Sequence, residues 1–103
     1  MPRNRPNRIS RKFSFSSRTR PAHDRAVITA YRFFLLGQNT AARNIYEQLL
    51  ARDPMDADAW YGLGDAWFHD TATATIGERM THSLRAFKRV LALDTDYFLA
   101  FEH

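Results

Sequence analysis

Side chains able to do chemistry are few and scattered in this 103-residue chain. Without cysteine it has no thiolate ligand, no disulfide and no cysteine nucleophile. His69 and Asp70 are adjacent, with Glu78 and His82 further along the chain. Their types suit a metal ion, but their spacing matches no known ligand motif. We therefore expect neither a metal site nor a cofactor.

Motifs that would indicate catalysis are also missing from the sequence. It contains no G-x-S-x-G turn, no phosphate-binding loop and no H-E-x-x-H pair. Gly62 and Gly64 lie inside a helical pattern, where they favour close packing of helices over contact with a nucleotide. We therefore expect no catalytic residues, and the chain is predicted not to be an enzyme.

Charge divides the chain into two parts. Residues 1–20 carry six Arg and one Lys without an acid, a charge of +7, whereas residues 21–103 have a net charge of −3. The segment 1–22 also contains three prolines, several serines and few large apolar residues. Such a composition buries too little apolar surface to offset the entropy of ordering. Residues 1–22 are therefore predicted to be a disordered Arg/Ser-rich tail.

From residue 23 onward, apolar residues recur at helical spacing. The first helix is expected to begin with Asp24 as its N-cap and to end before a turn at Gly37-Gln38-Asn39. The second is expected to end at Asp53-Pro54, because the residue before proline avoids the helical region. The apolar positions of these two helices are Ala26, Ala30, Phe33 and Phe34, then Ala42, Ile45, Tyr46, Leu49 and Leu50.

Two more helices follow the same logic. Asp56 is the expected N-cap of a third helix, and residues 70–79 look like a loop or frayed helix. A fourth helix is expected from about Thr81 to Leu93, closed by Asp94-Thr95-Asp96, with residues 97–101 opening a fifth. The predicted apolar stripe of the fourth helix, which would face inward, is Leu84, Phe87, Val90 and Leu91. Without strand alternation, the chain is predicted to be all-α, built of tandem antiparallel helix pairs.

Two copies of one pattern in this region resemble the tetratricopeptide repeat (TPR). Trp60, Leu63, Gly64 and Trp67 follow its W-x2-L-G-x2-Y pattern, with Trp67 in place of the Tyr. The first copy has Ala26 where the Trp would stand, and the second has Thr95 where the closing proline would stand. The further positions that carry the resemblance are Ala30, Phe33, Gly37, Ala42, Tyr46, Pro54 and Phe87.

The resemblance implies a TPR-like α-solenoid fragment. Its repeats would span residues 23–56 and 57–97, with an insertion near 70–80 in the second, and 98–103 would start a truncated third helix pair. TPR segments of bacterial multidomain signalling proteins are similar, so the chain could be part of such a protein, a kinase for example. An exposed face at the C-terminal repeat would also permit self-association.

The resemblance further implies a non-catalytic scaffold that binds a peptide or protein along a concave surface. That surface is formed mainly by the first helix of each pair. Aromatic walls with an acidic patch suit an apolar or basic peptide. The candidate partner-binding residues are Val27, Tyr31, Phe34, Leu35, Asp58, Tyr61, Asp65, Phe68 and His69. The carboxylate clamp of chaperone-binding TPR domains is not expected, because Val27 and Tyr31 replace its Lys and Asn.

The basic tail leaves several interpretations open. It could bind nucleic acid or an anionic surface, act as a mitochondrial transit peptide, or be a solvated leader. It could also fold onto the acidic groove of the repeats. A chain without cysteine fits the cytoplasm. Apolar runs such as Phe33 to Leu36 are far too short to cross a membrane.

Overall fold

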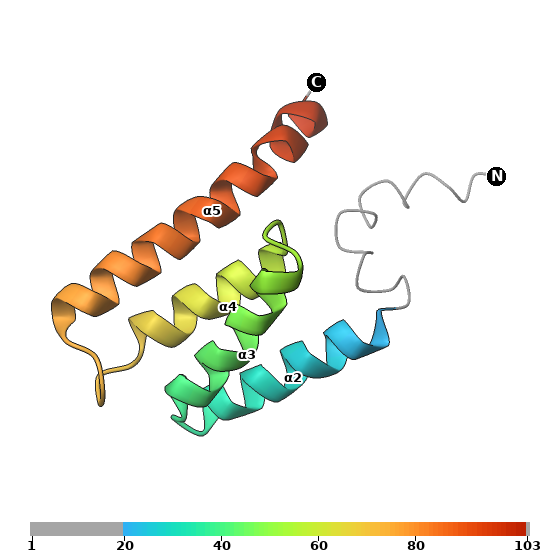
Figure 1. Ribbon diagram of the computed structural model, residues 1–103. Helices are drawn as coiled ribbons and strands as arrows, with labels where there is room; N and C mark the ends of the chain where they lie inside the picture. Colours follow the sequence, from blue (N-terminus) through green and yellow to red (C-terminus); the bar gives the residue numbers. More distant parts are fainter. Residues whose placement is uncertain (1–19, 103) are drawn as a thin grey trace.

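A computed structural model describes the backbone of residues 20–102 and the side chains of residues 20–93. It contains α2 (Pro21–Leu35), α3 (Asn39–Arg52), α4 (Ala57–Phe68) and α5 (Ile76–Glu102). Figure 1 shows α2 and α3 as one antiparallel pair and α4 and α5 as the next, with α4 packed against α3. The described part is thus all-α, as predicted. The predicted disordered tail falls, up to residue 19, outside the described residues.

α2 begins earlier than expected. Its first residue is Pro21 and its N-cap is Arg20, so the prediction of Asp24 as N-cap is wrong. Proline is favoured at the first helical position because its ring sets φ and its missing N–H would have no partner there. Asp24 lies in the first turn, where its negative charge interacts favourably with the helix dipole.

The connection between α2 and α3 and the end of α3 follow the local signals in the sequence. Gly37 has a φ of 78°, a conformation that side chains with a Cβ rarely adopt, and it forms the turn after α2. Asp53 has extended angles, φ −145° and ψ 97°, directly before Pro54. Both predictions are confirmed.

α5 also begins earlier than the predicted Thr81. The loop after α4 ends at Thr75, whose Oγ1 accepts a hydrogen bond from the Glu78 N–H at 3.1 Å. In return, Glu78 Oε1 accepts from the Thr75 N–H at 2.9 Å. This reciprocal arrangement is a capping box of the form T-x-x-E. The T-x-x-E spacing is present in the sequence, but the neighbouring threonines and glycine are residue types that favour a loop.

The inward face of α5 differs from the predicted stripe. Leu84 and Leu91 are 59% and 64% exposed, whereas Ser83 and Ala86 are buried and Phe87 and Val90 partly buried. The cause is the close approach of α4 and α5 at Gly64, where an added Cβ would lie 2.6 Å from the Phe87 ring. So close a crossing favours small side chains beside it, and the large leucines lie outside.

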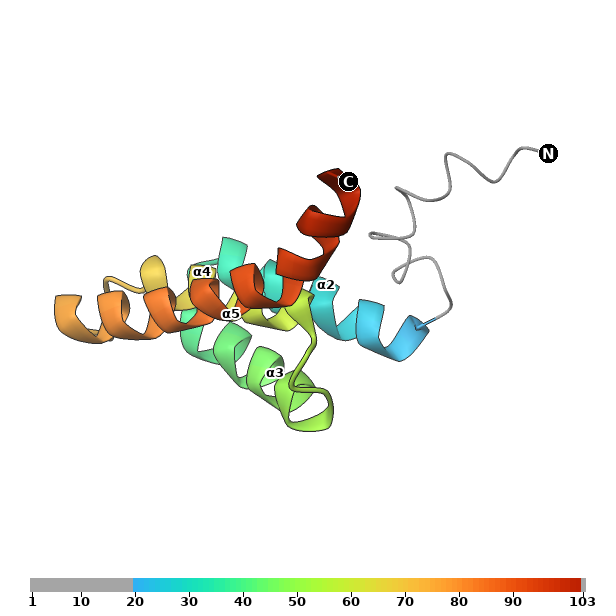
Figure 2. The same ribbon diagram turned by 90° about the horizontal axis from the view of Figure 1, so that it is seen from above.

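Helix α5 also continues through Asp94-Thr95-Asp96 to Glu102. The predicted end of a helix at this point is wrong, since the segment contains no proline or glycine to stop it. Figure 2 shows the last part of α5 bending away from the axis of the rest. The repeat boundaries at 56/57 and 97/98 stay predictions.

Small residues dominate the core between the two pairs. Ala30, Ala42, Ala59 and Ala66 are buried together with Leu49, Leu63 and Tyr46. Alanines let the backbones of adjacent helices approach, and the Tyr46 ring fills the remaining space at the α3–α4 crossing. Among the described residues, no helix is both long and apolar enough to cross a membrane.

Candidate functional site

The candidate site is a surface shared by α2 and α4. We call it the α2–α4 surface, and its members are the nine residues proposed from the sequence: Val27, Tyr31, Phe34, Leu35, Asp58, Tyr61, Asp65, Phe68 and His69. All lie on these two helices or directly after α4. Tyr31, Leu35, Tyr61, Phe68 and His69 are exposed, and the other four are partly buried.

Four rings of this surface form a connected row. Tyr31 stacks on Phe34 with the ring centroids 5.9 Å apart. Phe34 meets His69 edge-on at 5.5 Å, and His69 meets Phe68 at 5.1 Å. The row thus runs from α2 to the end of α4 and joins the two helix pairs. Tyr31 and Phe68 remain 51% and 41% exposed, so a ligand can reach both ends of the row.

Tyr61 lies apart from this row. Its ring centroid is 5.9 Å from that of Phe87 on α5, so Tyr61 leans toward the second helix of its own pair. Val27 and Phe34 pack partly against the core. The nine residues therefore comprise an aromatic row, an acidic pair, side chains that also support the core, and two exposed residues outside the row, Leu35 and Tyr61. Whether they bind a partner stays a prediction.

The acidic pair is Asp58 and Asp65, two turns apart on α4 and hence on one side of the helix. Burial raises the pKa of both carboxyls; the charge of Asp56 raises that of Asp58 further, and His69 partly opposes the shift of Asp65. Burial also raises the pKa of Tyr46 to about 12, with further contributions from Asp65, Tyr31 and Asp58.

The Tyr46 hydroxyl therefore lies within electrostatic reach of both acids. The sequence pattern predicts Tyr46 as a core aromatic residue, but it does not show where the hydroxyl lies. The ring crosses α4 at Gly62, where an added Cβ would lie 2.1 Å from Tyr46 Cζ and 2.6 Å from its hydroxyl oxygen. The missing side chain of Gly62 thus leaves room for the Tyr46 ring, in agreement with the prediction that this glycine serves helix packing.

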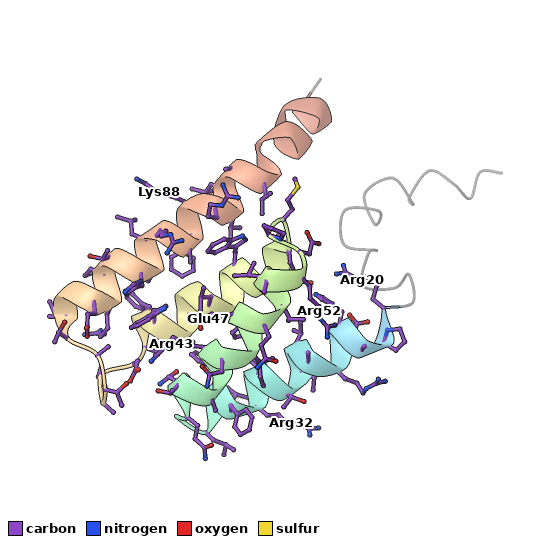
Figure 3. All side chains as sticks on the ribbon, in the orientation of Figure 1. Arg20, Arg32, Arg43, Glu47, Arg52 and Lys88 are labelled. Carbon is purple, nitrogen blue, oxygen red and sulfur yellow. The ribbon has the colours of Figure 1, made fainter. Side chains whose placement is uncertain are left out.

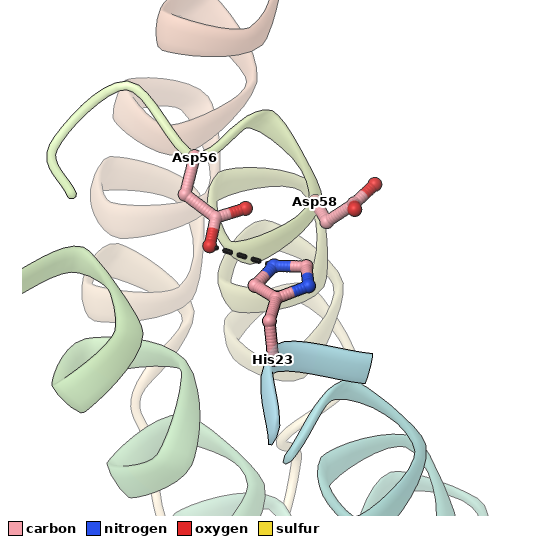
Figure 4. Close-up of side chains that lie close together, drawn as sticks. All are labelled: His23, Asp56 and Asp58. Atoms are coloured by element: carbon pink, nitrogen blue, oxygen red, sulfur yellow. Dashed lines mark hydrogen bonds and ion pairs between the residues drawn. The ribbon is translucent and has the colours of Figure 1, made fainter. Parts of the chain in front are cut away.

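A second cluster, absent from the sequence predictions, lies where α2 and α4 begin (Figure 4). His23 Nε2 is 2.9 Å from Asp56 Oδ2, and His23 Nδ1 is 3.1 Å from Asp24 Oδ1. Asp58 lies beside the ring, and within residues 20–93 only His23, Asp56 and Asp58 gather as three ligand-type side chains. With a carboxylate at each ring nitrogen, the cluster acts as a polar clamp between the two helix pairs.

The four side chains considered for a metal in the sequence, His69, Asp70, Glu78 and His82, do not form such a group among the described residues. His69 is part of the aromatic row, and Glu78 caps α5. His82 stacks on Trp67 with the ring centroids 4.1 Å apart. Each therefore has a structural contact of its own.

Asp70 anchors the loop between α4 and α5 to α3. Arg43 Nη1 donates to Asp70 Oδ2 at 2.6 Å, and the Thr73 N–H donates to Asp70 Oδ1 at 3.0 Å. The Arg43 guanidinium also lies 3.9 Å from the Trp67 ring centroid. Figure 3 shows Arg43 between α3 and this loop. Burial by itself raises the pKa of Asp70, but the hydrogen bonds from Thr73 and Arg43 outweigh it and lower the pKa to about 2.

Asp56 has two roles, which makes it a test of the polar clamp. Its Oδ1 accepts from the Ala59 N–H at 3.1 Å, as predicted for the N-cap of α4, and its Oδ2 faces His23. We expect Asp56→Ala to lower the free energy of unfolding by about 2 kcal/mol, more than the loss of an average cap. Asp56→Ser keeps a cap but loses the His23 contact, and should show an intermediate loss in urea titrations. Equal stability of all three proteins would contradict both roles.

Comparison with known proteins supports the repeat interpretation. A family model for the tetratricopeptide repeat matches residues 29–98, more than half of the chain. Searches of curated proteins and of solved structures found no significant match. The matched span includes the second copy of the sequence pattern and the first copy from residue 29 onward, and the described helices pair as that pattern implies. The chain therefore belongs to the tetratricopeptide-repeat family.

Proposed function

We propose that this chain is a non-catalytic scaffold that binds a peptide or a segment of a partner protein along the α2–α4 surface. Tetratricopeptide repeats generally mediate protein–protein interaction, and the surface supplies the means. The observation that carries the proposal is the aromatic row from Tyr31 to Phe68, which joins two helices and leaves both ends exposed. Aromatic side chains of this kind often contribute most of the binding energy at protein interfaces.

The acids favour a particular ligand chemistry. Asp58 and Asp65 lie on the same helix as Phe68 and carry charges that their partial burial disfavours. A ligand that combines basic and aromatic side chains would satisfy both features, since its cations would offset these charges and its rings would extend the row.

A peptide selection tests the proposal. Peptides selected from a random library on the full chain should lose at least about tenfold in affinity when Tyr31→Ala and Phe68→Ala are combined, because truncating an anchor ring typically costs more than 1 kcal/mol. The readout is fluorescence anisotropy with each labelled peptide.

Met55→Ala is the matched control, because Met55 is a similarly exposed apolar residue outside the α2–α4 surface, in the connection between α3 and α4. It should leave the affinities unchanged. Selected peptides that bind the double variant as tightly as the native chain would refute the α2–α4 surface as the binding site.

The exposed apolar side chains of α5 favour a second surface. Ile76, Met80 and Leu84 recur every four residues, so they lie on one side of the helix, and all three are exposed. Such a face suits the next helix of a longer array or a second copy of the chain. Self-association through this face stays a prediction of the sequence. Nucleic-acid binding through the tail also stays a prediction of the sequence.

A further inference from the structure

The α2–α4 surface combines exposed aromatic rings with two carboxylates, Asp58 and Asp65, whose negative charge the neighbouring cations do not fully balance. Near Asp58, burial and the charge of Asp56 raise the pKa of this carboxyl, and the opposing effects of His23 and Arg20 do not offset them. The same holds for Asp65 beside His69. A further cation at these carboxylates would lower the free energy of their charged forms. The surface therefore favours a ligand that is both basic and aromatic.

One segment of the chain has this composition and is joined through Arg20 to the first helix of the surface. Residues 1–19 carry five Arg and one Lys without an acid, and they include Phe13 and Phe15. The described chain starts at Arg20, at the beginning of α2 (Figure 3). Here α2 meets the start of α4 through His23 and Asp56, and the charge of Arg20 acts on Asp58.

The segment is also long enough to follow the surface. Nineteen residues reach about 60 Å when extended, whereas the twelve residues of α4 span about 18 Å. A ligand that is part of the same chain and close in sequence to its site has an effective concentration in the millimolar range. Even a weakly binding segment would then occupy the surface for much of the time.

We infer that residues 1–19 bind intramolecularly to the α2–α4 surface, with their basic side chains near Asp58 and Asp65, and so compete with external peptides. This inference rests on the proposed function, since it names an occupant and a regulator of the same surface. Binding of a partner then requires release of the basic segment.

The test uses the full chain with a neutralised segment, the Gln-tail variant. It combines Arg3→Gln, Arg5→Gln, Arg8→Gln, Arg11→Gln, Lys12→Gln and Arg18→Gln. The probe is a labelled synthetic peptide of residues 1–19, measured by fluorescence anisotropy at one fixed salt concentration. We expect the peptide to bind the Gln-tail variant at least about fivefold more tightly than the native chain, where the attached segment competes.

Acid variants in the Gln-tail background locate the binding. Asp58→Asn combined with Asp65→Asn should weaken peptide binding by about fivefold, as expected for two partly exposed charge pairs. Their folding should persist, because both substitutions remove a charge that burial disfavours. Glu47→Gln removes one exposed charge from α3 and should change the affinity less than about twofold.

Equal affinity of the probe for the native chain and the Gln-tail variant would overturn the inference, as would an effect of Glu47→Gln as large as that of the acid pair. The proposed function fails by a different result. If library peptides bind through Tyr31 and Phe68 equally well in the native chain and the Gln-tail variant, the proposed scaffold function is supported. The inference that residues 1–19 occupy the surface is then refuted. If neither library peptides nor the probe depend on this surface, both proposals fall.

Discussion

Asp70→Asn is expected to lower the free energy of unfolding by about 3 kcal/mol, the range observed when one partner of a buried ion pair is removed. Asp70 is only 2% exposed and accepts from Arg43 and Thr73. The amide keeps the shape of the side chain but cannot balance the Arg43 charge, whose side chain is 12% exposed. Urea titration of the full chain by circular dichroism would measure the loss.

Glu47→Gln serves as the control, since Glu47 is exposed on α3 and its substitution should change stability by less than about 0.5 kcal/mol. Arg43→Met completes a double-variant cycle. The loss for the double variant should be clearly smaller than the sum of the two single losses, because each single change leaves the other group buried without its ion pair. Additive losses would show that Asp70 and Arg43 do not interact as the structure has them.

The pH dependence gives this prediction a second readout. The pKa of Asp70 is lowered from 3.8 to about 2 in the folded state, so in this window the unfolded state binds more protons. The stability that this shift contributes, about 2 kcal/mol, is present above pH 4 and is lost as the pH falls toward 2. Asp58 and Asp65 act with the opposite sign, because their raised pKa means that protonation favours the folded state.

The difference between the native chain and Asp70→Asn isolates the Asp70 contribution, since both proteins share the other acids. That difference should shrink as the pH is lowered from 4 to 2. A difference that stays constant over this range would contradict the lowered pKa of Asp70.

Gly62→Ala and Gly64→Ala should both destabilise the fold, although alanine is the better helix former by about 1 kcal/mol. The new Cβ would lie 2.1 Å from the Tyr46 ring at Gly62 and 2.6 Å from the Phe87 ring at Gly64. Tyr46 is buried, so its ring cannot move without disturbing the core. We expect a net loss of about 1–3 kcal/mol for each variant, larger at Gly62. Thermal melting followed by circular dichroism would measure it.

Two other glycines provide matched controls. A Cβ at Gly77, in the first turn of α5, would meet only Thr75 Oγ1 at 4.0 Å, so Gly77→Ala should be neutral or stabilising by up to about 1 kcal/mol. Gly37 has open space around it but a φ of 78°, so Gly37→Ala should be destabilising by about 1 kcal/mol through backbone strain alone. If Gly62→Ala and Gly77→Ala raised the melting temperature alike, the close helix crossing at Tyr46 would be refuted.

Features governed by a few neighbouring residues could be predicted from the sequence. Asp53 ends α3 because Pro54 follows it, Gly37 forms a turn that needs positive φ, and Asp56 caps α4 through its own side chain. Thr75 and Glu78 belong to the same class, because the T-x-x-E spacing of their capping box lies within four residues of the sequence. These signals are local, since the physical cause lies within three or four residues.

The repeat pattern in the sequence also predicted the protein family. The spacing of Trp60, Leu63, Gly64 and Trp67 predicted a tetratricopeptide repeat, and the family match confirms it. The same pattern predicted that helix contacts occur near Gly64, because a glycine inside an amphipathic helix marks a close approach. It could not show which side of α5 would face that approach, and the prediction of Leu84 and Leu91 as inward residues was wrong.

The sequence by itself thus determined the helical class, the repeat family, most helix ends and the contrast between a basic tail and acidic repeats. Only the tertiary structure decided that His23 meets Asp56, that Arg43 meets Asp70, and that the Tyr46 hydroxyl lies near Asp58 and Asp65. The partners in these pairs are 12 to 33 residues apart in the chain. Their encounter depends on how the helices pack against one another over long sequence separations, and no local pattern sets that.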